Sequence, residues 1–339
     1  MSAPVIAARA SARNRRTVLD EALIKRLAGL GTVRRNVPLA RHTTFGIGGP
    51  ADVLVTVRGA AALADAVRLT RQAGAPLWIM GAGSNVLVGD AGVRGVVIDN
   101  QAKAVDVIAL PEGASIPQRF AEAPRDALVL VTLESGASFA AAARQLGRQG
   151  LSGIEWACGI PGTLGGAAVY NAGAYDGCLA DVLATTTVLD GGGEERRISS
   201  ADLRLTYRSS AILRGELPDA VVLSVGIVLR RGDPEEIARR IAELDRQRLD
   251  AQPRGRNSGS VFKNPPDRHA WELVDAVGLR GYRMGDAQIS AKHCNFIENL
   301  GAARAADVAA LIAEAQRRVR ERFGIDLERE VEFVGEGFA

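Results

Sequence analysis

Histidine and cysteine are scarce in this 339-residue chain, and their scarcity excludes several kinds of site. The few copies lie far apart, in a spacing that fits neither a disulfide framework nor a zinc site. They are Cys158, Cys178, Cys294, His42, His269 and His293. Long apolar runs are also missing, since none approaches the roughly 20 residues that a membrane helix needs. The sequence therefore predicts no metal centre and no membrane span.

Charge of one sign is missing as well, because the formal net charge is only +3. Arg9, Arg13, Arg15 and Arg16 lie in residues 1–16 without an accompanying acid, so the remainder carries about −1. A nucleic-acid surface is therefore not expected. Residues 1–16 are small and basic but lack the apolar stretch of a secretory signal. They are predicted to be a disordered tail of a cytoplasmic protein.

Helical and strand-like patterns alternate irregularly, which favours an α+β fold over a doubly wound sheet. Helices are predicted at 61–73, at 138–150 with Ser138 as N-cap, from Asp233 with Pro234 in the first turn, near 269–278 and at 305–323. Strands are predicted at 76–80, 93–98 and 127–135, in a hairpin at 185–199, and at 293–299 and 326–335. The chain is long enough for two or three domains.

Two glycine-rich loops adjoin apolar segments. The first, MGAGSNVLVGD, spans 80–90, and the second, GIPGTLGGA, spans 159–167. Glycine lets a backbone approach a ligand closely, and successive N–H groups can form a nest that binds an anion. A single loop of this kind is more often a plain turn. Two of them in one region indicate a site for a diphosphate that carries a large flat group.

A third glycine-rich stretch, GIGGPA at 46–51, matches the dinucleotide fingerprint only formally. Pro50 stands where a helix should begin, and the residues that follow have a strand pattern. Because the required strand–turn–helix context is missing, a Rossmann fold is disfavoured. The chain also has no P-loop lysine and no G-x-S-x-G elbow.

The segment SGSVFKNP at 258–265 raises the question of what Ser260 does. A nucleophile, a helix cap and some other role are all open from the residue types. No histidine lies near in sequence to activate Ser260 as a nucleophile. Ser258 is its rival by position and is interpreted as a loop or cap hydroxyl.

These and other segments together resemble the UDP-N-acetylenolpyruvoylglucosamine reductase family. The resemblance extends over nearly the whole chain and keeps the family's order of motifs. It rests on PLARHTTFGIGGPAD (38–52), IMGAGSNVLVGDAGVRGVVI (79–98), GLSGIEWACGIPGTLGGAAVYNAGAYDG (150–177), YRSS (207–210), GSVFKNP (259–265), GYRMGDAQISAKHCNFIEN (281–299) and LEREVEFVG (327–335). The short separation of Arg208 and Ser260 resembles the shorter, type II subclass, which lacks an inserted clamping tyrosine.

The resemblance implies a fold of the vanillyl-alcohol-oxidase type, in which two lobes cradle non-covalent FAD and an α+β domain binds substrate. By this resemblance the lobes are expected at 17–100 and 101–232. The substrate-binding domain is expected at 233–325, and residues 326–339 are expected to return to the active site. Residues 109–127 are interpreted as a surface insertion. The expected partners are a small-molecule sugar nucleotide and NADPH, and the chain is expected to be a monomer.

The reaction that the resemblance implies has two halves and belongs to peptidoglycan precursor synthesis. NADPH reduces FAD, and N5 of the reduced flavin then passes a hydride to the enolpyruvyl β-carbon of UDP-N-acetylglucosamine enolpyruvate. The product is UDP-N-acetylmuramate. Ser260 matches the family's proton donor to the α-carbon. Arg208 matches the arginine that faces the substrate carboxylate, and Glu330 matches the glutamate that polarises the forming enol.

The resemblance also implies binding residues for the cofactor and the substrate. The expected cofactor-binding residues are Gly81, Ala82, Gly83, Ser84 and Asn85 in the first loop, and Ile160, Pro161, Gly162, Thr163, Gly165 and Gly166 in the second. The expected substrate-binding residues are Tyr207, Lys263, Asn264, Arg280 and His293.

Two other functions stay open on the residues. The first is an FAD-dependent oxidase of the same fold, which would lack the combination of Ser260, Arg208 and Glu330. The second is a non-catalytic protein that binds FAD or a sugar nucleotide. Pattern alone also leaves open which of Glu328, Glu330 and Glu332 acts, because alternate residues of a strand share one face.

Overall fold

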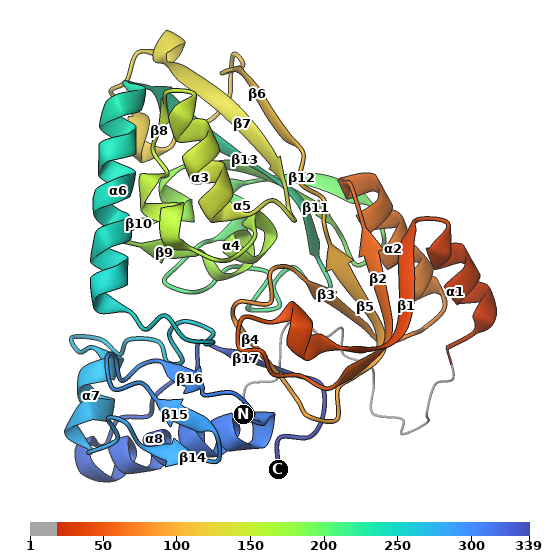
Figure 1. Cartoon of the computed structure of the whole chain (residues 1–339). Helices are drawn as coiled ribbons and strands as arrows, with labels where there is room; N and C mark the ends of the chain where they lie inside the picture. The colour runs from red at the N-terminus through yellow and green to blue at the C-terminus, as the bar shows by residue number, and fades with distance from the viewer. Residues whose placement is uncertain (1–18) are drawn as a thin grey trace.

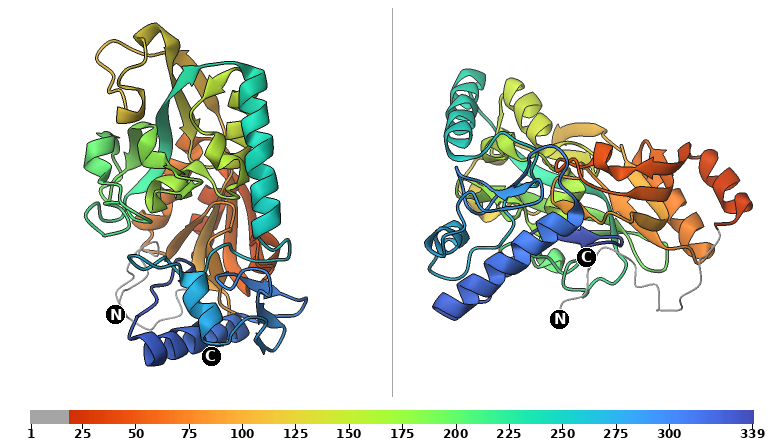
Figure 2. Two further views of the ribbon diagram at one scale, coloured as in Figure 1. Left: turned by 90° about the vertical axis from the view of Figure 1, so that its left-hand side faces the viewer. Right: turned by 60° about the horizontal axis from the view of Figure 1, so that its bottom comes forward.

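The computed structural model describes residues 19–339. The tail predicted at 1–16 lies outside the described residues. The chain forms two mixed α/β parts built on larger sheets and a smaller C-terminal part below them (Figure 1). The rotated views show the long C-terminal helix on the outer side of that smaller part (Figure 2). These parts agree with the predicted α+β class.

The first part is a four-stranded sheet in the order β1-β2-β5-β3 with two helices. Its elements are α1 (Glu21–Ala28), β1 (Gly31–Pro38), β2 (Pro50–Val57), α2 (Ala60–Gln72), β3 (Leu77–Met80) and β5 (Val93–Asn100). β1 pairs with β2 antiparallel, whereas β5 pairs parallel with both β2 and β3. Leu63 and Val67 of α2 pack on Val55 and Ile98 of the sheet. The helix covers the sheet because its apolar residues recur at helical spacing.

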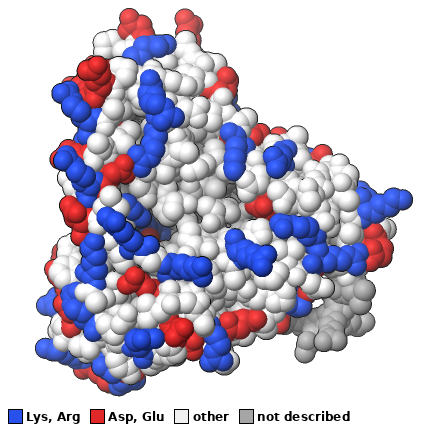
Figure 3. Space-filling view, viewed as in Figure 1, with Lys and Arg blue, Asp and Glu red and all other residues white. Residues whose placement is uncertain are grey.

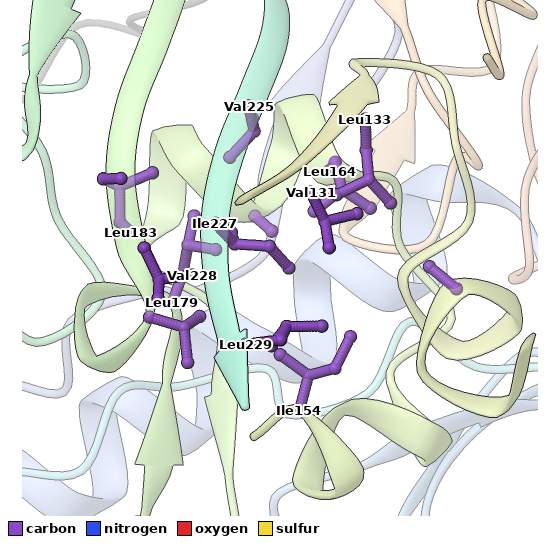
Figure 4. Close-up of a cluster of buried hydrophobic side chains, with 14 of the residues drawn as sticks. Val131, Leu133, Ile154, Leu164, Leu179, Leu183, Val225, Ile227, Val228 and Leu229 are labelled. Atoms are coloured by element: carbon purple, nitrogen blue, oxygen red, sulfur yellow. The ribbon is translucent and has the colours of Figure 1, made fainter. Parts of the chain in front are cut away.

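The second part is a larger sheet in the order β12-β11-β13-β7-β6, to which β8 adds by pairing with β13. Its strands are β6 (Val105–Ala109), β7 (Leu128–Glu134), β8 (Leu151–Ser152), β11 (Leu183–Leu189), β12 (Glu195–Ser199) and β13 (Val221–Arg231), with a small hairpin of β9 (Gly173–Ala174) and β10 (Gly177–Cys178). Its helices are α3 (Phe139–Arg148), α4 (Leu164–Tyr170), α5 (Ser200–Leu203) and α6 (Pro234–Ala251). Side chains of β7, β11 and β13, among them Val131, Leu183 and Ile227, fill its core (Figure 4).

The C-terminal part places two helices against a small antiparallel sheet. Its elements are α7 (Ala270–Ala276), β14 (Arg283–Met284), β15 (Ala287–Ile289), β16 (Ile297–Asn299) and α8 (Ala305–Phe323). α8 ends at Gly324, whose φ of 68° is the left-handed conformation that glycine adopts at helix ends. Val308, Leu311 and Ile312 form the buried face of α8.

The last strand differs from its prediction. Only β17 (Glu332–Val334) is a strand, and it pairs parallel with β4 (Val86–Val88), directly after the first glycine loop. Residues before it pair instead with the serine segment, through an isolated bridge of Phe262 and Arg329. The predicted strand 326–335 was therefore wrong as one element, because it changes partners midway. The predicted strand 293–299 is likewise limited to β16.

The other predicted elements are confirmed within a few residues. Ser138 caps α3 by accepting from the N–H of Ala141, and Asp233 caps α6 by accepting from that of Glu235. The segment 109–127 packs on the hydrophobic core of the second part through Leu110 and Phe120, whose side chains are buried, at 8% and 7% exposure. The short 3-10 helices are Leu39–His42, Gln118–Phe120, Arg125–Ala127, Glu155–Gly159 and Leu179–Asp181. The predicted domain boundaries stay a prediction.

Candidate active site

Three segments that are distant in sequence lie side by side at the junction of the three parts. The N–H of Glu330 donates to the carbonyl oxygen of Val261 at 2.8 Å, and the N–H of Lys263 donates to that of Glu328 at 2.9 Å. On the other edge, the side-chain amide of Asn85 donates to the carbonyl oxygen of Glu330 at 3.0 Å. The segment 328–332, which carries Glu330, therefore runs between the serine segment and the first glycine loop.

Ser260 lies in this arrangement without a catalytic partner of the serine-hydrolase kind. It is partly exposed, and it follows Gly259, which has a φ of 79° and open space around it. Within residues 19–339 no histidine forms a hydrogen bond with its hydroxyl. Neighbouring Ser258 is buried at 4% exposure, and its hydroxyl has no partner in the described part of the chain. The geometry favours Ser260 over Ser258 as the accessible hydroxyl.

Arg208 and Glu330 form a largely buried ion pair. Nε of Arg208 lies 2.7 Å from Oε1 of Glu330, and the two side chains are 21% and 15% exposed. Nη2 of Arg208 also donates to the carbonyl oxygen of Gly173 at 3.1 Å. Arg208 has a φ of 50°, a left-handed conformation that costs a non-glycine residue about 1–3 kcal/mol. Such strain is typical of residues that a site holds in place.

Burial raises the pKa of the Glu330 carboxyl above its ordinary value, while Arg208 and Lys263 oppose that shift. Desolvation dominates because a charge is costly to hold away from water. The carboxyl therefore keeps its proton to a higher pH than a solvated glutamate. A carboxyl with this property next to a guanidinium is typical of a catalytic site.

Tyr207 and Asn264 connect the second part of the chain to the C-terminal part. The Tyr207 hydroxyl accepts from the N–H of Asn264 at 3.4 Å, and the Tyr207 ring lies 5.4 Å from Cζ of Arg208. Tyr207 remains 56% exposed and can also contact a ligand. Oδ1 of Asn264 accepts from the N–H of Ala270 at the start of α7, so this oxygen is engaged. Nζ of Lys263 lies 2.6 Å from Glu328.

Arg280 and His293 lie elsewhere in the C-terminal part. Arg280 binds both carboxylate oxygens of Asp275, at 2.8 and 2.6 Å, and also the carbonyl oxygen of Ala291. His293 packs against Phe296, and its Nδ1 accepts from the N–H of Asn295. Burial lowers the pKa of His293. No hydrogen bond or ion pair in the described residues links either one to Arg208, Glu330 or Ser260, so their substrate role stays a prediction.

The two glycine-rich loops touch each other. A Cβ added to Gly81 would lie 2.5 Å from Oγ1 of Thr163, and one added to Gly162 would lie 3.6 Å from Oγ of Ser84. In residues 19–339 no group accepts from the N–H groups of Ala82, Gly83 and Ser84. Two touching loops with free N–H groups form one cradle that suits a diphosphate. The structure thus brings the predicted loops together.

A substitution of Gly83 tests whether this cradle binds the cofactor. Its φ is 62°, and a Cβ there would lie 2.1 Å from the carbonyl oxygen of His42. We expect Gly83→Ala to lower the unfolding free energy by about 2 kcal/mol or more and to weaken FAD binding. Thermal melts and flavin titration measure both. Gly74→Ala is the control, since Gly74 has a φ of 64° in open space. Equal losses in both variants would show that backbone strain alone is responsible.

Arg248 of α6 is a candidate that the sequence analysis missed. A Cβ on Gly159, at the start of the second glycine loop, would lie 2.6 Å from Cδ and 3.1 Å from Nη1 of Arg248. Burial lowers the pKa of this guanidinium. Within residues 19–339 it has no hydrogen-bond or ion-pair partner, so it is free to receive an anion. Nothing in the sequence distinguishes it from the other arginines of α6.

Basic side chains also surround the recessed centre of the molecular face seen in Figure 1 (Figure 3). Two touching glycine-rich loops suit a cofactor diphosphate, and the matching family models define the class of protein as a flavoprotein. A family model described as "FAD binding domain" matches residues 51–199. A second, described as "UDP-N-acetylenolpyruvoylglucosamine reductase, C-terminal domain", matches residues 250–334.

Individual relatives extend these matches over most of the chain. The UDP-N-acetylenolpyruvoylglucosamine reductase of Lachnoclostridium phytofermentans is 38% identical, over 92% of this chain and 96% of its own length. That of an Anaeromyxobacter species is 43% identical, over 90% of both chains. The crystal structure of the Thermus caldophilus reductase superposes with a TM-score of 0.72 at 36% identity, covering 90% of this chain and 99% of that one. This chain belongs to the UDP-N-acetylenolpyruvoylglucosamine reductase family.

Family membership confirms the predicted resemblance, the flavoprotein fold and the FAD cofactor. It favours the reductase over the oxidase and the non-catalytic binder. The roles of individual residues are a separate matter, and they rest on the geometry of the site.

Proposed function

We propose that this chain reduces UDP-N-acetylglucosamine enolpyruvate to UDP-N-acetylmuramate with electrons from NADPH. The observation that carries the proposal is the buried pair of Arg208 and Glu330, held between the Ser260 segment and the cofactor loop. When bound, FAD supplies hydride transfer between NADPH and the substrate. The protein side chains supply binding, orientation and the proton.

Arg208 binds the carboxylate of the enolpyruvyl group. A guanidinium stays charged at any working pH and matches the geometry of a carboxylate. It thereby stabilises the negative charge that develops on the α-carbon and spreads into the carboxylate. Glu330, as a protonated acid, polarises the forming enol together with Arg208.

The hydroxyl of Ser260 delivers a proton to the α-carbon. An alcohol is a weak acid, but a carbanionic carbon is a strong base, so a well-placed hydroxyl suffices. The proton of Ser260 is then restored by a bound water chain or by Lys263, whose backbone pairs with the same strand.

Polar groups around Arg208 and Glu330 bind the diphosphate and the sugar of the substrate. Arg248 supplies an unpaired positive charge, and Lys263 can exchange its exposed partner Glu328 for a phosphate. Tyr207 and Asn264 close the site from the two sides. Arg280 and His293 serve more distant parts of the nucleotide.

Glu330 gives the second half-reaction a specific pH dependence. Because burial raises its pKa, the protonated form is present at low pH and is lost as pH rises through that raised value. We expect the rate of flavin reoxidation by substrate to fall over the same range. Glu330→Gln keeps a neutral donor, so its slower rate should lack this titration. A rate profile measured by stopped flow that is identical for both proteins would contradict the role.

An anaerobic experiment tests the function itself. NADPH should bleach the flavin absorbance of the purified protein, and added UDP-N-acetylglucosamine enolpyruvate should restore it. Restoration only by oxygen would favour the oxidase, and a flavin that NADPH does not bleach would favour the non-catalytic binder. Either result would contradict the proposal.

None of the helices in residues 19–339 is both long and apolar enough to cross a membrane. NADPH and a nucleotide sugar are soluble, highly charged molecules, which supports an enzyme that acts in the cytoplasm. We further propose that it acts as a monomer, because Ser260, Arg208 and Glu330 come together within one chain. Size-exclusion chromatography with light scattering measures the oligomeric state.

A further inference from the structure

Asn85, the residue of the first glycine loop that directly precedes β4, is bonded to both Glu330 and Glu332. Its side-chain amide donates to the carbonyl oxygen of Glu330 at 3.0 Å. Its own carbonyl oxygen accepts from the N–H of Glu332, also at 3.0 Å. The parallel ladder of β4 and β17 begins at the next residue, where Val86 pairs with Glu332. Asn85 thus extends the ladder back to the residue that carries the proposed acid.

The opposite edge of the segment that carries Glu330 is held by the serine segment. The N–H of Glu330 donates to Val261, the residue after Ser260. The backbone of Glu330 is therefore fixed between the proposed proton donor on one side and Asn85 on the other. Its carboxyl reaches Arg208 across the site. Loss of the Asn85 amide would remove this donor from the carbonyl oxygen of Glu330. The backbone of Glu330 would then be held only by the serine segment on that part of the chain.

The residues directly before Asn85 are those whose N–H groups have no acceptor in residues 19–339. The N–H groups of Ala82, Gly83 and Ser84 can donate to the cofactor diphosphate. The side-chain amide of Asn85 donates instead to the carbonyl oxygen of Glu330. A loop that orders around a diphosphate therefore orders the segment of Glu330 as well. Sequence reasoning placed Asn85 among the cofactor contacts, and the structure gives it a different partner.

We propose that Asn85 is a positioning residue, which ties the placement of Glu330 to the occupancy of the cofactor loop. This inference rests on the proposed function for its catalytic consequence. Its structural half, the tether between loop and strand, stands independently of the reaction.

Asn85→Asp is the sharpest variant, because it keeps the shape of the side chain and replaces the donor with an acceptor. Asn85→Ala is the second variant and removes the contact without adding charge. Asn299→Ala is the control, since the side-chain amide of Asn299 donates to the carbonyl oxygen of Phe45 at 2.9 Å in a similar tether. The side chain of Asn299 also accepts from the N–H groups of Gly301 and Ala303, so this variant removes at least as many hydrogen bonds as either Asn85 variant.

The first readout is hydrogen exchange of residues 328–334 in the FAD-free and FAD-loaded proteins. In the wild type and in Asn299→Ala, FAD should slow exchange of this segment by about tenfold or more. In both Asn85 variants, FAD should bind and give little such protection. Full protection in the Asn85 variants would overturn the tether, whether or not the protein catalyses the proposed reaction.

The second readout is anaerobic stopped flow. We expect flavin reduction by NADPH to stay within about threefold of wild type in the Asn85 variants. Reoxidation by UDP-N-acetylglucosamine enolpyruvate should slow by about tenfold to a hundredfold, because an ångström of misplacement is costly in a catalytic site. The pH profile of reoxidation should also shift, since the surroundings of Glu330 change. A wild-type rate with an unshifted profile would overturn the inference, whereas failure of the wild-type protein to reoxidise would overturn the proposed function instead.

Discussion

Ser260→Ala should leave flavin reduction by NADPH intact and slow flavin reoxidation by substrate by about a thousandfold or more. The reason is that the hydroxyl serves only the step in which the α-carbon takes its proton. A positioned general acid contributes about 10²–10⁴-fold. Removing one partly exposed hydroxyl leaves the loop conformation, set by Gly259 and the Val261 hydrogen bonds, unchanged. Anaerobic stopped flow separates the two half-reactions.

Ser258→Ala is the matched control for that prediction. Its hydroxyl is buried and has no partner among residues 19–339, so its removal should change neither half-reaction appreciably. A Ser260→Ala enzyme slowed equally in both halves would contradict the proton-donor role. A large effect confined to Ser258→Ala would identify Ser258 as the proton donor and would contradict the role of Ser260.

Arg208→Ala should lower the rate of flavin reoxidation by about a hundredfold to a thousandfold. Removing one group that stabilises developing negative charge typically has an effect of this size. The loss also leaves the buried carboxyl of Glu330 without its partner, which raises the pKa of Glu330 further. Arg208→Lys should recover only part of the rate, because an ammonium cannot bind a carboxylate in bidentate fashion. Reduction by NADPH should change little.

Arg204→Ala is the control for Arg208. Arg204 also has a positive φ, 43°, but pairs with Glu216 at 3.1 Å on the surface, where its side chain is 64% exposed. We expect this variant to retain wild-type rates in both halves. If Arg208→Ala behaved in the same way, Arg208 would be an ordinary surface arginine and the proposed carboxylate site would be wrong.

The sequence could predict the glycine loops and most elements because their signals are local. Ser138 and Asp233 predict helix starts because their side chains can accept from backbone N–H groups of the first turn. Both residues cap the predicted helices in the structure. The contact between Gly81 and Thr163 is a property of tertiary structure, and no local pattern encodes it. Arg248 was missed for the same reason.

The three glutamates near the C-terminus show the limit of pattern most clearly. Alternation placed Glu328, Glu330 and Glu332 on one face and could not choose among them. In the structure Glu328 is exposed and pairs with Lys263, whereas Glu330 is buried and pairs with Arg208. Burial also raises the pKa of Glu332. Partners contributed by distant segments, and not strand alternation, distinguish the proposed acid.

The most direct test of the proposed reaction is a single turnover in D₂O with unlabelled substrate, analysed by NMR of the product. The enzyme is first reduced with 4-protio NADPH and freed of nucleotide, and substrate is then added without oxygen. UDP-N-acetylmuramate should carry one deuterium at the α-carbon, from a solvent-exchanged proton donor, and one at the β-carbon, because the N5–H of a reduced flavin exchanges with D₂O while the nucleotide is removed. A parallel reaction in H₂O should contain no deuterium. Product with protium at the α-carbon in D₂O, or no product at all, would contradict the proposed reaction.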